Sequence, residues 1–95
     1  MHALEKIKIL DLSMYLAGPY GPALLSDLGA EVVKVEPLQG EPLRSLTGAY
    51  LGWNHGKRSI TIDLTLSQGQ EIVHKLVQES DVVVENYRPS VAERL

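Results

Sequence analysis

The sequence predicts an α/β protein with a mostly parallel sheet and flanking helices. Strand-like and helix-like segments alternate along the chain, a pattern typical of parallel sheets with right-handed crossovers. The strand-like segments read mainly as runs of Val, Ile and Leu, as in strands that helices cover. Phe is absent and Trp occurs once, so the core must be built almost wholly from aliphatic side chains.

Strands are predicted at residues 7–12, 31–36, 59–64 and 81–85. Segment 7–12 is aliphatic, and the valines of 31–36 and 81–85 are β-branched and typical of buried strands. Segment 59–64 alternates apolar and polar residues, which predicts a strand exposed on one face.

The first predicted helix has its apolar face in Leu24, Leu25 and Leu28. Pro19 suits a first helical turn, where its missing N–H costs nothing. Pro22 is also expected in or near that turn. Gly29 is placed to end the helix in the left-handed conformation.

A second helix is predicted from residue 67, and a third begins near residue 90. Ser67 and Gln70 have capping-box spacing, and so do Ser90 and Glu93. The second helix has its apolar face in Ile72, Val73, Leu76 and Val77. Residues 37–56 hold two Pro and four Gly and predict a long irregular loop of the kind that is often functional. A short helix around residues 49–53 is the alternative.

Composition excludes several classes of protein. The chain has 95 residues, of which 44% are hydrophobic and 22% charged, with a net charge of -3. These values predict one globular domain and argue against a nucleic-acid partner. The apolar runs are too short to span a membrane, and no basic-then-apolar leader is present. The lack of Cys excludes disulfides and thiol chemistry, and fits a cytoplasmic protein.

A ligand is expected beyond the carboxyl ends of the strands, where open α/β sheets bind their ligands. Segments 13–18, 63–65 and 86–89 and the start of 37–56 all follow strands. Asn86 offers an amide, Tyr87 a flat ring and Arg88 a guanidinium. These are the three kinds of contact that a nucleotide needs. A solvated loop at the start of a helix is the alternative.

Other candidates have weaker patterns. Residues 18–21 (GPYG) could hold an anion at a helix start, but they are not the dinucleotide fingerprint. Glu36 stands where a dinucleotide fold places its ribose-binding acid. Lys57 and Arg58 form either a pair that steers phosphates or a solvated loop pair. Asp11 suits a catalytic acid or, more often, a cap for the following turn.

Metal and triad chemistry find no support in the sequence. His2, His55 and His74 are scattered through terminus, loop and helix. No pair of them has metal-ligand spacing, so no metal is expected. No Ser/His/Asp arrangement is recognisable, and the G-x-S-x-G motif is absent.

Together, these segments resemble the start of the class III CoA-transferases (CaiB/BaiF family), a group that includes formyl-CoA transferase, carnitine CoA-transferase and α-methylacyl-CoA racemase. The matching blocks are ILDLS at 9–13, AGP at 17–19, LSDLGAEVVKVEP at 25–37, NHGKRSI at 54–60, DL at 63–64 and DVVVENYRP at 81–89. Their order and spacing make the resemblance specific, and it covers nearly the whole chain.

The resemblance implies a Rossmann-like fold, of which residues 1–95 would form a partial CoA-binding domain. It also implies an interlocked homodimer. Transferases of this family move CoA from an acyl-CoA to a carboxylic acid through intermediates on one Asp, which is nucleophilic catalysis by a carboxylate. The racemase branch exchanges the proton next to the thioester carbonyl. The family's catalytic Asp is expected beyond residue 95, so no catalytic residue is assigned within this chain.

By position, the resemblance implies CoA contacts from Leu16, Ala17, Ile62, Asp63, Leu64, Thr65, Asn86, Tyr87, Arg88 and Arg94. Three departures weaken parts of this set. Many members have Arg at Pro37 and Lys at Thr65, and the formyl branch has Gln at Leu16, which makes oxalate or formate chemistry less expected.

Two readings outside the transferase and racemase branches stay open. One is a small free-standing nucleotide-binding module, which titration with NAD and ATP against CoA would separate from a CoA protein. The other is a non-catalytic fragment that associates through exposed sheet.

Overall fold

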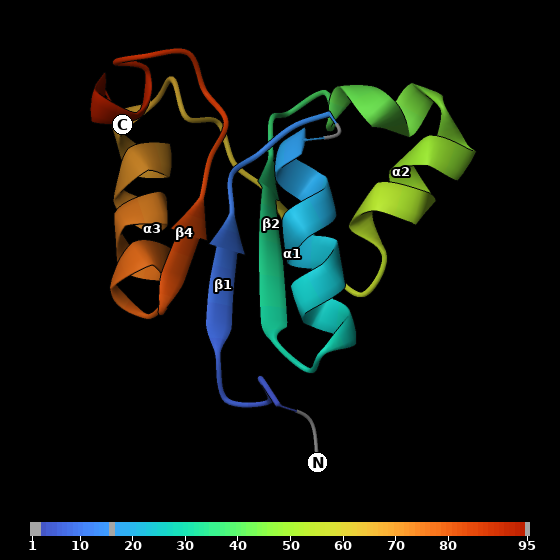
Figure 1. Ribbon diagram of the computed structural model, residues 1–95. Helices are drawn as coiled ribbons and strands as arrows, with labels where there is room; N and C mark the ends of the chain where they lie inside the picture. Colours follow the sequence, from blue (N-terminus) through green and yellow to red (C-terminus); the bar gives the residue numbers. More distant parts are fainter. Residues whose placement is uncertain (1–2, 16, 95) are drawn as a thin grey trace.

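A sheet of four parallel strands forms the middle layer of the computed structural model, which describes residues 3–15 and 17–94 (Figure 1). The strands are β1 (Lys8–Asp11), β2 (Glu31–Glu36), β3 (Arg58–Thr61) and β4 (Val82–Val84). Their spatial order is β3-β2-β1-β4, and Leu10 at the centre of the sheet pairs with Val33 on one side and Val83 on the other. The predicted α/β class with a parallel sheet is confirmed.

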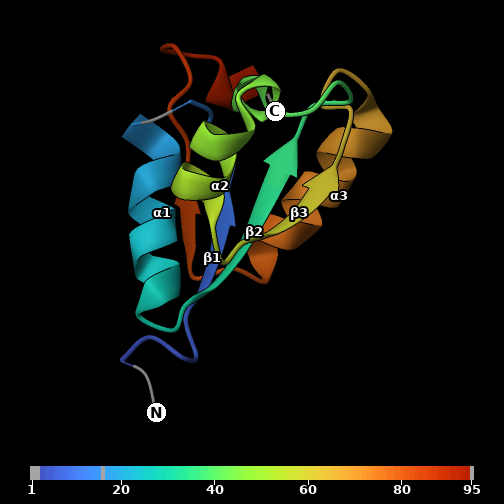
Figure 2. The ribbon, with the colours of Figure 1, turned by 90° about the vertical axis from the view of Figure 1, so that its right-hand side faces the viewer.

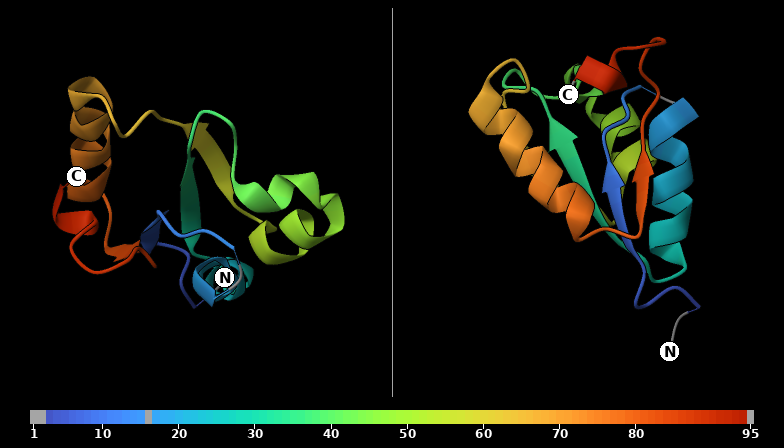
Figure 3. Two further views of the ribbon diagram at one scale, coloured as in Figure 1. Left: turned by 90° about the horizontal axis from the view of Figure 1, so that it is seen from above. Right: turned by 90° about the vertical axis from the view of Figure 1, so that its left-hand side faces the viewer.

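Helices cover both faces of this sheet. Helix α1 (Ala17–Asp27) lies on one face with α2 (Thr47–Asn54) beside it, and α3 (Ser67–Gln78) lies on the other (Figures 2 and 3). The described residues also form two short 3-10 helices, η1 (Pro42–Ser45) and η2 (Ala92–Arg94). None of the described helices is long and apolar enough to cross a membrane.

The core is divided by the sheet into two aliphatic clusters. On the α3 face the buried members are Leu10, Leu12, Val35, Ile62 and Val73. On the α1 face they are Ile9, Ala30 and Val32. Successive side chains of a strand point to opposite faces, so β1 and β2 supply both clusters. This alternation also decides which polar residues of the strands reach which face.

The predicted helix boundaries are only partly correct. Gly29 has φ 104° and ends α1 as expected. However, α1 begins at Ala17, which places Pro22 inside the helix rather than in its first turn. The capping box at Ser67 is wrong: Leu66 is the N-cap and makes no side-chain cap hydrogen bond. The Gln70 amide instead donates to the Leu64 carbonyl at 3.0 Å.

Two other predictions also need correction. Segment 37–56 is not one irregular loop, because it contains η1 and α2; the alternative of a short helix is confirmed. Strand β4 is not buried, since Val82 and Val83 lie at the edge of the sheet and are exposed. The capping-box spacing at Ser90 does not start an α-helix within the described residues; Ser90 is left-handed, with φ 69°, and η2 follows.

A candidate ligand site at the carboxyl ends of the strands

The loops that follow the strands meet around a cavity of about 420 Å³. Leu12, Val35 and Ile62 contribute to it from the α3 side of the sheet, and Tyr87 reaches it from the segment after β4. The complete lining is Leu12, Met14, Val35, Glu36, Pro37, Leu38, Gln39, Pro42, Ile62, Asp63, Leu64, Thr65 and Tyr87. An apolar interior with a few polar groups is typical of small-molecule sites.

Loop 62–65 is shaped by its own hydrogen bonds. The Asp63 carboxylate accepts from the Thr65 backbone N–H at 3.0 Å and from the Thr65 hydroxyl at 2.6 Å. These bonds lower the pKa of Asp63. Gly69 lets α3 approach the loop closely, because a Cβ there would lie 2.0 Å from the Asp63 carbonyl oxygen. The helix and the cavity wall are therefore packed backbone to backbone.

Tyr87 is the aromatic side chain of the cavity. It is half-buried and packs against the aliphatic cluster on the α3 face. Burial raises the pKa of its hydroxyl, and the nearby Glu85 and Asp11 carboxylates raise it further. Tyr87 therefore stays neutral at physiological pH, with an apolar ring face and a hydroxyl donor available to a ligand.

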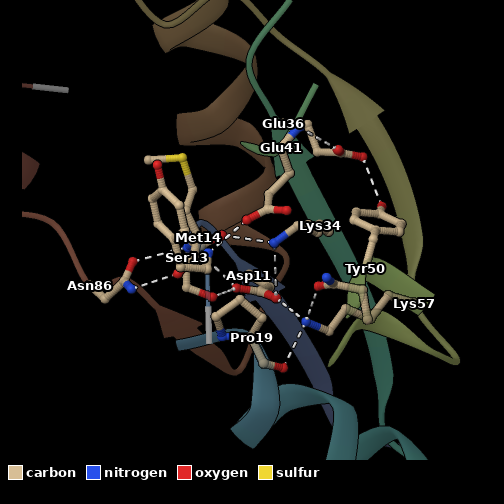
Figure 4. A network of polar contacts seen from close by, with 12 residues as sticks. Asp11, Ser13, Met14, Pro19, Lys34, Glu36, Glu41, Tyr50, Lys57 and Asn86 are labelled. Carbon is tan, nitrogen blue, oxygen red and sulfur yellow. Dashed lines mark hydrogen bonds and ion pairs between the residues drawn. The ribbon is translucent and has the colours of Figure 1, made fainter. Parts of the chain in front are cut away.

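The opposite face of the same strand ends carries a buried ionic network (Figure 4). The Lys57 ammonium lies 2.5 Å from an Asp11 carboxylate oxygen, and the two side chains are 1% and 0% exposed. Lys57 also donates to the Pro19 carbonyl at 2.9 Å and to the Asn54 side-chain oxygen at 2.8 Å. Lys34, also fully buried, lies 3.9 Å from Asp11.

Burial sets the direction of the lysine pKa shifts. Removal from water lowers the pKa of both Lys34 and Lys57, because it disfavours the charged form. The Asp11 carboxylate opposes this shift at both lysines. The network joins β1, β2 and the segment after α2 through charges that have little access to water.

Glu36 ends β2 on the same face as this network. Its two oxygens accept from Arg44 at 2.6 and 2.7 Å, from the Glu41 N–H at 2.9 Å and from the Tyr50 hydroxyl at 3.1 Å. Chiefly through Arg44, these contacts lower the pKa of Glu36 to about 2. Burial raises the pKa of Tyr50 to about 12. Because the four acceptor positions of the Glu36 carboxylate are occupied, a ribose-binding role is not supported.

The structure brings together part of the residue set implied by the resemblance. Ile62, Asp63, Leu64, Thr65 and Tyr87 line the cavity. Asn86 precedes Tyr87 in the chain and holds the backbone of Met14. Arg88 and Arg94 are exposed and are not part of the cavity lining. Ala17 opens α1, and Leu16 lies outside the described residues.

The structure also places the other charged residues that the sequence singled out. Both readings of Lys57 are wrong, since its side chain is buried, whereas Arg58 is exposed and pairs with Glu31. Asp11 caps the following turn as expected, accepting from the Ser13 N–H at 2.9 Å. His55 pairs with Asp27 through 3.0 Å contacts.

For the remaining histidines, His74 is exposed and His2 lies outside the described residues. Sequence reasoning missed Lys34, Glu41, Arg44 and Tyr50. One sequence signal could have indicated that Lys34 and Glu36 share a buried face: both residues alternate with the valines of β2.

A parallel sheet covered on both faces defines an α/β domain, and its cavity lies at the carboxyl edge, where open α/β sheets bind their ligands. A model of CoA-transferase family III matches residues 4–95. The chain is 43% identical over 99 residues to a succinyl-CoA–D-citramalate CoA-transferase of Chloroflexus aurantiacus, covering 95% of this chain and 25% of that protein. It is 40% identical to a succinyl-CoA:mesaconate CoA-transferase of Haloarcula hispanica, covering 99% of this chain and 27% of that protein.

A solved structure agrees with these sequence matches. A CAIB/BAIF family protein from Brucella suis superimposes with a TM-score of 0.94 at 35% identity, covering 98% of this chain and 28% of that one. The chain therefore belongs to CoA-transferase family III. It spans about a quarter of the length of the Chloroflexus and Haloarcula relatives.

Proposed function

We propose that residues 1–95 form the CoA-binding part of a class III CoA-transferase, which moves CoA from an acyl-CoA to a carboxylic acid. The observation that carries this proposal is the cavity at the carboxyl ends of β1–β4. Its volume of about 420 Å³ is in the range of small-molecule sites, roughly 300–1,000 Å³. Family membership supports CoA as the occupant.

The cavity chemistry suits the adenine of CoA. Tyr87 offers a ring face for stacking, and Leu12 and Ile62 offer aliphatic surface on the same side of the sheet. Arg88 and Arg94 follow Tyr87 in the chain and are exposed, so we assign them to the phosphates. Guanidinium groups bind phosphates through paired N–H donors.

This chain's part in the reaction is binding and orientation of CoA. The aspartate that forms the acyl and CoA intermediates lies outside residues 1–95 in this proposal. The Chloroflexus and Haloarcula relatives are named as CoA-transferases, which favours the transferase branch over the racemase branch. The proposal includes a cytoplasmic homodimer, and light scattering would check the dimer.

Calorimetric titration of the chain with CoA tests the binding site. We expect CoA to bind more tightly than NAD or ATP. Replacing Tyr87 with Ala should weaken CoA binding about 10-fold, because stacking of a base on an aromatic ring contributes roughly 1–3 kcal/mol. Y87F keeps the ring and should bind nearly as tightly as the unmodified chain.

An exposed residue of α3 supplies the control. H74A lies away from the cavity lining and should leave the CoA affinity unchanged. Absence of measurable CoA binding at millimolar concentration, or tighter binding of NAD or ATP, would overturn the proposed function.

A further inference from the structure

Side chains from other segments form hydrogen bonds to the backbone of the loop after β1. We call residues 13–15 the β1 loop. The Ser13 carbonyl accepts from the Lys34 ammonium at 2.8 Å, and the Tyr15 N–H donates to a Glu41 carboxylate oxygen at 2.6 Å. The Ser13 N–H donates to Asp11. Side chains from β1, β2 and the segment after β2 therefore hold the two ends of this loop, and Figure 4 shows Asp11 and Lys34 beside Ser13.

Asn86 completes this set from the segment after β4. Its side-chain oxygen accepts from the Met14 N–H at 3.0 Å, and its side-chain NH₂ donates to the Met14 carbonyl at 2.8 Å. A carboxamide has one acceptor and one donor group in the arrangement of a peptide bond. The Asn86 side chain thus pairs with Met14 at both of its backbone groups.

The conformation of the β1 loop needs such support. Tyr15 has φ 66°, a left-handed conformation that costs a side-chain-bearing residue roughly 1 kcal/mol or more. Strained residues of this kind persist where the surrounding structure determines their backbone, and they cluster at binding and catalytic sites.

Gly18 in α1 packs closely against both Ser13 and Asn86. A Cβ at this position would lie 2.2 Å from the Ser13 Cβ and 3.1 Å from the Asn86 side-chain carbon Cγ. Only glycine lets the helix start come this close to both residues. The β1 loop and Asn86 are therefore packed against α1 as well as hydrogen-bonded to each other.

We propose that Asn86 is a positioning residue for the ligand of the cavity. It holds Met14, which lines the cavity, and fixes the β1 loop against the end of β4. This role acts through the β1 loop, unlike the direct CoA contact that the resemblance implied for Asn86. The inference rests on the proposed function, because it takes CoA as the ligand that the loop is held ready to bind.

Two substitutions separate the hydrogen bonds from simple packing. N86A removes both bonds to Met14. N86D keeps an acceptor for the Met14 N–H but places a carboxylate against the Met14 carbonyl. At pH 7 we expect each variant to bind CoA roughly 10-fold more weakly than the unmodified chain, as expected for lost neutral hydrogen bonds.

Acidification supplies the diagnostic result. A protonated carboxyl has the acceptor and the donor of a carboxamide. The affinity of N86D, taken relative to the unmodified chain at the same pH, should therefore recover as the pH falls from 7 towards about 4. The relative affinity of N86A should stay low throughout. Amide hydrogen exchange at Met14 should be faster in N86A than in the unmodified chain, with or without CoA.

The outcomes distinguish the two proposals. If the unmodified chain binds no CoA, the proposed function fails and the positioning role for CoA fails with it. If the unmodified chain binds CoA and both variants bind it as tightly as the unmodified chain does, the positioning role alone is overturned. A relative affinity of N86D that does not change with pH would also overturn it. Urea unfolding of each variant identifies any loss caused by unfolding.

Discussion

The two faces of the sheet differ sharply at the same strand ends. On the α3 face, Leu12, Val35 and Ile62 border an apolar cavity. On the α1 and α2 face, Asp11 and Lys34 belong to a buried ionic network. Adjacent residues of one strand therefore serve opposite purposes. One face borders the cavity, and the other holds the segments that follow β1 and β2.

This difference shows how the site is stabilised. The cavity side leaves apolar surface unfilled, which contributes little to the stability of the chain alone. The ionic side ties β1, β2 and the segment after α2 together, at the cost of taking charges out of water. We therefore expect substitutions in the ionic network to act mainly on folding, and substitutions of the side chains that line the cavity to act mainly on binding.

The largest effect is expected for Lys57. K57M leaves the Asp11 carboxylate buried, with the Lys34 ammonium 3.9 Å away as the remaining ion-pair partner. Removing one member of a buried pair costs about 3–5 kcal/mol, which urea unfolding would measure. The adjacent R58M is the matched control, because the Arg58–Glu31 pair is exposed and such pairs contribute about 0–1 kcal/mol. Equal losses in the two variants would contradict the contrast between buried and exposed charge.

The second largest effect is expected from acid, which should lower the stability that Glu36 contributes on the ionic side. The Glu36 carboxyl has a usual pKa of 4.5 and a folded pKa of about 2, so its ionised form stabilises the folded state. This stabilisation is complete above pH 4.5 and is lost as the pH falls to about 2. We expect a contribution of roughly 2–3 kcal/mol, reduced by the partial exposure of Arg44.

E36Q provides the comparison for this acid effect. The free energy of unfolding of E36Q, measured in urea across the same pH range, should fall less steeply than that of the unmodified chain. Parallel pH profiles for the two proteins would show that Glu36 is not the group responsible.

The smallest of these effects concerns Gly69 on the cavity side. G69A places a methyl group against the Asp63 carbonyl and should destabilise the chain by about 1–3 kcal/mol through overpacking. G52A is the matched control in α2, where a Cβ meets nothing within 4 Å. It should stabilise the helix by roughly 0.5–1 kcal/mol. Thermal unfolding would compare the two, and a stabilising G69A would show that α3 can move away from loop 62–65.

Much of the fold could be predicted from the residues in order. Strand β2 lies where its valines predicted it, at Glu31–Glu36, and the loops after the strands do meet around one cavity. Residues 62–65 and Tyr87 were placed together because parallel strands end at the same edge. Pro22 and α2 were predicted less well, because local propensity opposes a helix at Pro and Gly and tertiary packing overrides it.

The ionic network was harder to foresee. Lys57 and Asp11 are 46 residues apart, and no local pattern indicates that a lysine after a loop will be buried. Likewise, Asn86 and Met14 are 72 residues apart, so no local pattern indicates the contact between the Asn86 side chain and the β1 loop.

The amino-acid sequence by itself determined the class of sheet, the alternation of helices and strands, and the edge at which the loops after the strands meet. These features follow from hydrophobic periodicity and chain direction, which are properties of neighbouring residues. Only the tertiary structure decided which charges are buried, which of them pair, and which polar side chains hold a loop. Those outcomes depend on removal from water by distant segments, because the free energy of a charged group is set by the groups that surround it in the folded chain.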